Sequence, residues 1–189
     1  MIITKEWAMP NKDTFKIKPI KEFIERQIFR DAVIVEPFVG NSQFGNITND
    51  INPDKFAQYH MDALAFLNIL PDNSADIILY DPPYSLHQAI EIYQSYGADK
   101  LAISVGNMKY WRECKDRISK IVKPDGKCIC FGWNTNGLGI KRGFRMDEIL
   151  IVSHGGSRND TLVTLETRIS SGDVDYSLND KVSRGRRLF

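Results

Sequence analysis

The sequence predicts a single α/β domain over residues 1–189, with a mostly parallel sheet, helices on both faces and a terminal antiparallel hairpin. Two observations indicate this fold class. Short apolar runs rich in Val and Ile alternate with segments whose apolar residues recur at helical spacing. The last two apolar runs are joined by only six residues, 155–160, too few for the crossover that parallel strands need.

The first predicted elements are one helix and two strands. Residues 19–29 place Ile and Phe side chains on one helical face, and a proline is tolerated in the first turn. The run 32–38, AVIVEPF, is mostly β-branched and predicts a buried strand followed by a turn. Residues 47–51, ITNDI, predict a second strand, which Asn52 and Pro53 would end.

The middle of the chain predicts two helices separated by a strand. Residues 62–70 predict a helix with Asp62 near its N-cap. The apolar run 75–80, ADIILY, predicts a buried strand that two prolines end sharply. Residues 86–95 predict the next helix, so the alternation of strands and helices continues.

The last third of the chain predicts a helix, a strand and the hairpin. Residues 107–122 have a clear helical periodicity, which Pro and Gly end. The run 127–132, KCICFG, predicts a strand, and 133–143, with three Gly and two Asn, predicts a loop or a short helical turn. Residues 148–154 and 161–167 predict the two hairpin strands.

Composition and charge indicate which kinds of partner and location to expect. The chain has 25 Lys and Arg against 24 Asp and Glu, a net charge of +1, which gives no overall basic signature for nucleic acid. The C-terminal tail, 181–189, has four basic residues and no acidic one, and is either a phosphate contact or a solvated end. No apolar run approaches the ~20 residues of a membrane span. The absence of a signal-peptide pattern predicts a cytoplasmic protein without a membrane partner, or one in host cytoplasm if phage-encoded.

The cysteines predict no metal centre. The three Cys residues form no CxxC pair, and no His cluster accompanies them. Cys128 and Cys130 would point to the same side of their strand, with Ile129 on the other. We therefore expect buried, reduced thiols.

Three motifs follow predicted strands: EPFVG at 36–40, TNDINP at 48–53 and DPPYS at 81–85. In open α/β sheets, ligands bind beyond the carboxyl ends of the strands, where the strand order reverses. The motif after 75–80 is the most informative. Two prolines fix φ and remove two N–H donors, leaving rigid carbonyls beside the Asp81 carboxylate. Asp81 and the Pro82 carbonyl could accept the two N–H groups of an exocyclic amine while Tyr84 stacks on its flat ring.

With these motifs the sequence resembles the adenine-N6 DNA methyltransferases that carry a DPPY motif, in their small phage-type form without a separate target-recognition domain. The resemblance covers most of the chain. It includes TFKIKPIKEFI at 14–24, EPFVGNSQFG at 36–45, HMDALAFL at 60–67, DPPYS at 81–85 and GWNTNG at 132–137. It implies a Rossmann-like methyltransferase fold, S-adenosylmethionine as cofactor and adenine in DNA, flipped out of the duplex, as substrate.

The resemblance also implies the site residues. The catalytic motif is Asp81, Pro82, Pro83 and Tyr84. The implied cofactor contacts are Thr14, Phe15, Lys18, Glu36, Pro37, Phe38, Gly40, Asn41, Asp50, Asp62 and Asp81. Asp50 would accept the ribose hydroxyls, Asp62 the adenine amine, and Lys18 would face the methionine carboxylate; Asp62 as a helix cap and Lys18 as a surface charge remain alternatives.

The chain departs from the family pattern in two ways. Ser42 stands where the cofactor loop usually has its second Gly, and no insertion is large enough for a recognition domain. Target recognition would then come from loops 96–111 and 134–143, a homodimer or a specificity partner. Candidate phosphate contacts are Arg142, Arg145 and Arg158, and His154 is interpreted as a turn residue or substrate contact.

Three other functions remain open from sequence. The same chemistry could act on RNA or single-stranded DNA, or the chain could be a non-catalytic S-adenosylmethionine-binding subunit. A nucleotide-dependent oxidoreductase is less favoured because GNSQFG, at 40–45, lacks the GxGxxG pattern. The sequence does not distinguish restriction-modification, defence evasion and regulation, and it does not set the target sequence or the oligomeric state.

Overall fold

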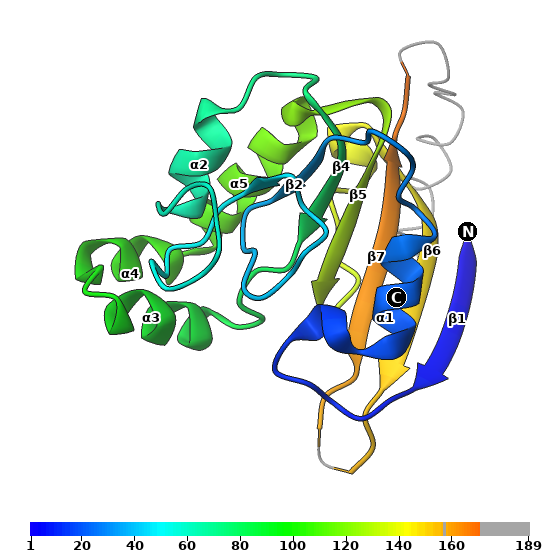
Figure 1. Ribbon diagram of the computed structural model, residues 1–189, viewed down its shortest axis with the longest axis horizontal. Helices are drawn as coiled ribbons and strands as arrows, with labels where there is room; N and C mark the ends of the chain where they lie inside the picture. The colour runs from blue at the N-terminus through cyan, green and yellow to red at the C-terminus, as the bar shows by residue number, and fades with distance from the viewer. Residues whose placement is uncertain (157, 171–189) are drawn as a thin grey trace, which may run out of the picture.

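A computed structural model describes residues 1–156 and 158–170. Within them the strands form one mixed sheet in the order β1-β6-β7-β5-β4-β2-β3 (Figure 1). The strands are β1 (Ile2–Trp7), β2 (Ile34–Glu36), β3 (Ile47–Thr48), β4 (Ala75–Tyr80), β5 (Val122–Gly132), β6 (Phe144–Ser153) and β7 (Thr161–Arg168). β7 runs antiparallel to both β5 and β6, and the other neighbours are parallel. The predicted α/β architecture and its antiparallel hairpin are confirmed. The basic tail, 181–189, lies outside the described residues.

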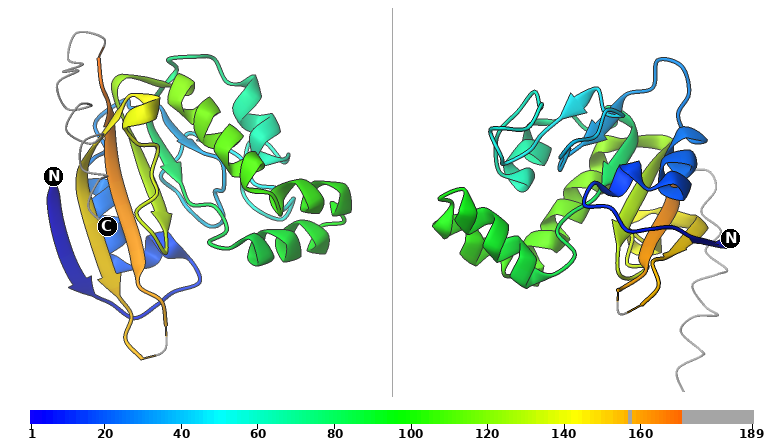
Figure 2. Two further views of the ribbon diagram at one scale, coloured as in Figure 1. Left: turned by 180° about the vertical axis from the view of Figure 1, so that it is seen from behind. Right: turned by 60° about the horizontal axis from the view of Figure 1, so that its bottom comes forward.

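Helices cover both faces of the sheet, as the sequence predicts (Figures 1 and 2). The helices are α1 (Lys18–Glu25), α2 (Ala63–Ile69), α3 (Leu86–Ser95), α4 (Asp99–Val105) and α5 (Met108–Ile121), with 3-10 turns η1 (Thr14–Lys16) and η2 (Ile140–Arg142). α1 packs Ile20 and Phe23 into one core with Leu79 and Phe131. α2 and α5 bury Phe66 and Ile118 in the core on the opposite face.

The central strands are buried on both faces, which explains their continuous apolar runs. In β5, Cys128 and Cys130 face the core under α2 and α5, while Ile129 faces the core under α1. The three cysteines are free and buried, in agreement with the sequence interpretation. Within the described residues no His, Cys, Asp or Glu group could hold a metal ion, and no helix is long and apolar enough to cross a membrane.

The strand order reverses between β2 and β4. From β2 the chain moves outward to β3 and then returns to β4 on the other side of β2. Because β2, β3 and β4 are parallel, their carboxyl ends lie at one edge of the sheet. Residues that follow these three strands therefore meet at the switch point, where ligands bind in such sheets.

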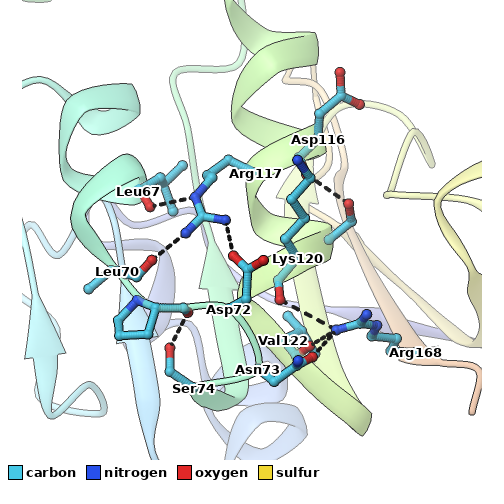
Figure 3. Close-up of polar contacts among 12 residues, drawn as sticks. Leu67, Leu70, Asp72, Asn73, Ser74, Asp116, Arg117, Lys120, Val122 and Arg168 are labelled. Carbon is cyan, nitrogen blue, oxygen red and sulfur yellow. Dashed lines mark hydrogen bonds and ion pairs between the residues drawn. The ribbon is translucent and has the colours of Figure 1, made fainter.

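At the amino end of β4, away from the switch point, two arginines hold the turn between α2 and β4 (Figure 3). Arg117 of α5 donates to the carbonyls of Leu67, at 3.1 Å, and Leu70, and pairs with Asp72. Arg168 of β7 donates to Asn73 Oδ1 at 2.6 Å and to the Val122 carbonyl. These bonds tie the turn between α2 and β4 to α5, β5 and β7, and so fix the start of β4 whose end carries the Asp81 motif.

Several predicted boundaries are wrong. The N-terminal strand β1 was missed because none of its residues is buried, so it lacks the alternation of a half-buried strand. Residues 47–51 form only a two-residue strand, β3, because the chain turns through Asp50 into a separate loop. Residues 96–111, interpreted as a recognition loop, contain α4 and the start of α5. The segment that contains the expected cofactor loop, residues 37–46, forms a Gly-rich loop that returns directly to β3.

Candidate functional site

A cleft of ≈ 680 Å³ opens at the switch point of the sheet. Its lining includes Phe38, Gly40 and Asp50, which follow β2 and β3, and the predicted catalytic motif 81–84, which follows β4. Thr14 of η1 closes another side. A recess of ≈ 90 Å³ shares Thr14, Phe38, Gly40 and Asp81 with the cleft and adds Phe15 and Asn41. The structure therefore brings most of the sequence-predicted residues together.

A second cavity of ≈ 320 Å³ lies on the other side of the catalytic motif. It shares Pro82, Pro83, Tyr84 and Trp133 with the large cleft. Its remaining lining includes Trp111 and other side chains from α5 and from the loop after β5. Residues 82–84 of the motif thus line both spaces, each large enough for part of a ligand, while Asp81 faces the large cleft and not the second cavity.

One oxygen of the Asp81 carboxylate is a buried acceptor without a donor. Its Oδ1 atom is buried and has no hydrogen-bond partner among the residues described. Burial raises the pKa of Asp81 to about 6, against a smaller opposing effect of the nearby Tyr84 and Thr14 hydroxyls. Pro82 and Pro83 carry no N–H that could fill the vacant position. At neutral pH the group is an ionised carboxylate that a ligand N–H could satisfy.

Two aromatic rings border both cavities. Tyr84 and Trp133 contact edge to face, with ring centroids 5.7 Å apart and an interplanar angle of 78°. Trp133 is 46% exposed, so part of its ring is open to solvent. The Tyr84 hydroxyl is buried near Asp81 and Thr14, and burial raises the pKa of Tyr84 above its ordinary value. Tyr84 is therefore a neutral ring beside the Asp81 carboxylate, suited to stacking on a flat ligand.

The Gly-rich loop is organised around Glu36. The carboxylate is fully buried, and its Oε1 accepts bonds from Ser42 Oγ, at 2.8 Å, and Gly45 N, at 2.5 Å. Burial raises the pKa of Glu36 to about 7. A Cβ on Gly45 would lie 2.9 Å from Glu36 Cγ, so this position requires glycine. Ser42 thus has a structural use for its hydroxyl where the family pattern has glycine. Glu36 supports the loop and does not itself line the cleft.

Asp50 lies where the sequence predicts it, in the wall of the cleft after β3. Its Oδ2 accepts from Gly40 N at 2.8 Å and its Oδ1 from Asn52 N at 2.9 Å. Gly40 has a φ of 53°, a conformation that favours glycine. Each carboxylate oxygen retains a second lone pair, so Asp50 can still accept bonds from ligand hydroxyls.

Besides Glu36, three more implied cofactor contacts do not line these cavities. Asp62 caps α2 through Ala65 N at 3.0 Å, and its other oxygen accepts from the Tyr110 hydroxyl at 2.5 Å. Lys18 begins α1 with its side chain 84% exposed and pairs with Glu22 at 3.8 Å. Pro37 offers its carbonyl to the Asn49 side chain at 3.0 Å. Asp62 and Lys18 match the helix-cap and surface-charge alternatives, and a cofactor role for all three residues remains only a prediction.

His154 is a cleft residue whose role the sequence left open. Its Nδ1 lies 2.9 Å from the Ala8 carbonyl and its Nε2 lies 2.8 Å from Thr161 Oγ1. Both ring nitrogens are therefore engaged, which makes His154 a connector between β6, β7 and the N-terminal segment. The signal in the sequence was its place at the end of an apolar run, directly before two glycines.

No family model and no curated protein matches this sequence. Solved structures do match. TrmN from Thermus thermophilus has a TM-score of 0.54 and 13% identity, over 81% of this chain and 49% of that one. A Burkholderia thailandensis 1,6-didemethyltoxoflavin-N1-methyltransferase with bound S-adenosylhomocysteine has a TM-score of 0.54 and 11% identity, over 81% of this chain and 78% of that one.

A third solved structure is the N-methyltransferase NodS from Bradyrhizobium japonicum, with a TM-score of 0.53 and 11% identity, over 85% of this chain and 100% of that one. This chain spans about half the length of TrmN but matches NodS over its full length. At these identities the matches concern the fold. The chain has the Rossmann-like methyltransferase fold that the sequence motifs imply.

Proposed function

We propose that this chain transfers a methyl group from S-adenosylmethionine to the exocyclic N6 amine of adenine in DNA. The observation that carries the proposal is the buried, unpartnered Oδ1 atom of Asp81, a residue that lines the large cleft. A carboxylate in this position lacks only an N–H donor. The similarity to methyltransferase structures, one of them solved with S-adenosylhomocysteine, supports the choice of cofactor.

The residues of the large cleft fit this cofactor. Asp50 has spare acceptor capacity for ribose hydroxyls, and Gly40 leaves its backbone open to close approach. Phe38 offers an apolar wall for a ring. The cofactor supplies a methyl group on a sulfonium, which needs little further activation. The chain's contribution is to position the acceptor amine and to exclude water.

Asp81 is proposed to activate the acceptor. The lone pair of an aromatic amine is delocalised into its ring, which makes the nitrogen a weak nucleophile. Hydrogen bonds from its two N–H groups to Asp81 and to the Pro82 carbonyl favour a pyramidal nitrogen with a localised lone pair. Tyr84 and Trp133 line the large cleft together with Asp81 and would stack on the base, offsetting part of the few kcal/mol that flipping costs.

A methyl-transfer assay tests this function. Radiolabelled S-adenosylmethionine is incubated with the protein and an adenine-containing duplex DNA, the same strand unpaired, or the RNA of that sequence. Label in N6-methyladenine of the duplex supports the proposal. Preference for single-stranded DNA or RNA would move the same chemistry to another polymer. Cofactor binding without transfer to any of the three would instead indicate a non-catalytic binding subunit.

Replacing Asp50 with Ala should weaken cofactor binding at least tenfold. The change removes a charged acceptor for two hydroxyls, each bond being worth roughly 1.5–3 kcal/mol. Asp54→Ala is the matched control, because Asp54 is exposed and lies outside the cleft lining. Calorimetric titration with S-adenosylmethionine measures both. Equal affinities in the two variants would show that Asp50 serves only the turn through Gly40 and Asn52.

Methyl transfer should decline as the pH falls through about 6, the raised pKa of Asp81. A raised pKa keeps the proton on at higher pH, so the accepting form is lost below this value, and kcat/KM should fall roughly tenfold per pH unit. The pKa of Glu36, raised to about 7, lies close to that of Asp81, so Glu36 could also contribute to the pH dependence of kcat/KM. Glu36→Gln separates the two groups: if Asp81 is responsible, this variant keeps the acidic limb. A flat profile in the wild type would contradict the role of Asp81.

A further inference from the structure

Two loops meet along one side of the large cleft. The segment after β1, residues 8–13, passes beside the connection between β6 and β7 (Figure 1). Ala8 N donates to the Ser153 carbonyl at 3.1 Å. The His154 ring bonds Ala8 on one segment and Thr161 on the other, at 2.9 and 2.8 Å. Main-chain and imidazole bonds therefore fix the two loops relative to each other.

Each of these loops contributes a cation to the cleft lining. Lys12 comes from the first loop and Arg158 from the second, and both residues are exposed. Within the described part of the chain neither takes part in an ion pair; the carboxylate next to Lys12, Asp13, pairs with Lys16 at 2.8 Å. Two positive side chains thus line the same cleft as the Asp81 motif, and neither forms an ion pair with a carboxylate of the described residues.

The other arginines considered from the sequence are engaged elsewhere. Arg142 pairs with Asp116 at 2.7 Å and donates to the Leu138 carbonyl. Arg145 pairs with Asp147 at 2.8 Å. Neither lines the cleft. Of the three candidates, the structure places only Arg158 beside the proposed active site.

We propose that Lys12 and Arg158 form a phosphate-binding rim that holds the polynucleotide backbone next to the target adenine. This inference rests on the proposed function. Lys and Arg side chains bind phosphate through charge-assisted hydrogen bonds, and such contacts position a nucleic acid without reading its sequence. His154 bonds Ala8 and Thr161 and so joins the two loops that carry these cations.

Binding titrations over a range of salt concentrations test the rim. The probes are short adenine-containing duplex DNA, its single strand and the corresponding RNA. Each phosphate contact contributes about 0.9 to the slope of log K against log salt, so Lys12→Ala and Arg158→Ala should each lower it by about one, and their double variant by about two. At 0.1 M salt each loss corresponds to roughly eightfold weaker binding. Arg158→Lys, which keeps the charge, should keep most of the slope.

Arg30→Ala is the matched control. Arg30 precedes β2, at the amino ends of the strands, and its side chain is 95% exposed. An unchanged slope in the double variant would overturn the rim while wild-type binding still supported the proposed function. Absence of binding by the wild type to every probe would overturn both. Weakened binding of S-adenosylmethionine with unchanged nucleic-acid affinity would assign the two cations to the methionine carboxylate and overturn the rim.

Discussion

Asp81→Asn should reduce methyl transfer at least ~100-fold and leave cofactor binding nearly unchanged. Loss of one positioned, charged acceptor in a desolvated site corresponds to about 3 kcal/mol of transition-state stabilisation. The Asn side chain keeps the volume but removes the charge, and its amide group would face the substrate amine with one donor in place of an acceptor. The effect should appear in kcat, because Asp81 is assigned to the amine and not to the cofactor.

Two measurements make this result interpretable. Single-turnover transfer of a radiolabelled methyl group reports the chemical step, and calorimetry with S-adenosylmethionine reports the cofactor site. Asp54→Asn changes an exposed carboxylate by the same chemistry and should behave as wild type in both. Turnover of Asp81→Asn within tenfold of wild type would remove Asp81 from its proposed role. A comparable loss of cofactor affinity would place it in the cofactor site.

Sequence predicted the catalytic region well because local patterns define it. Each motif follows an apolar run, and the carboxyl ends of parallel strands collect at one edge of a sheet. Asp50 and Asp81 therefore converge on one cleft although 30 residues separate them, an outcome that needs only the strand assignments and the switch in strand order. The cleft lining agrees with this reasoning, while the chemical roles of the residues remain proposals.

Features that depend on long-range contacts were not accessible from sequence. From sequence, Asp62 could either cap its helix or contact the cofactor. In the structure its second oxygen accepts from the Tyr110 hydroxyl, 48 positions away in the chain, and no local pattern indicates this contact. The position of Lys12 in the cleft lining follows from the packing of the N-terminal segment against His154, which the sequence does not indicate. β1 adds to the sheet through parallel pairing with β6, although its own residues are mostly exposed. Local periodicity in the sequence carries no information about such long-range contacts.

The loop after β5 shows how such a contact fixes part of the site. Glu166 of β7 is 0% exposed, and its two oxygens accept from Leu138 N, at 2.5 Å, and Gly139 N, at 2.9 Å. The same loop carries Trp133, which borders both cavities. The backbone passes so close that a Cβ on Gly137 would lie 2.0 Å from Glu166 Oε2. Position 137 therefore accepts only glycine while Glu166 stays in place.

Gly137→Ala should destabilise the protein by about 2–4 kcal/mol, since the added methyl group must displace a buried carboxylate or break its two backbone bonds. Urea unfolding measures the change. Gly132→Ala is the control, because its Cβ would meet nothing closer than Asn134 N at 4.0 Å. A second variant, Gly137→Ala with Glu166→Asp, shortens the acid and should recover part of the loss, which makes the two changes non-additive. A loss within about 0.5 kcal/mol of the Gly132→Ala control would show that the loop adapts without Glu166.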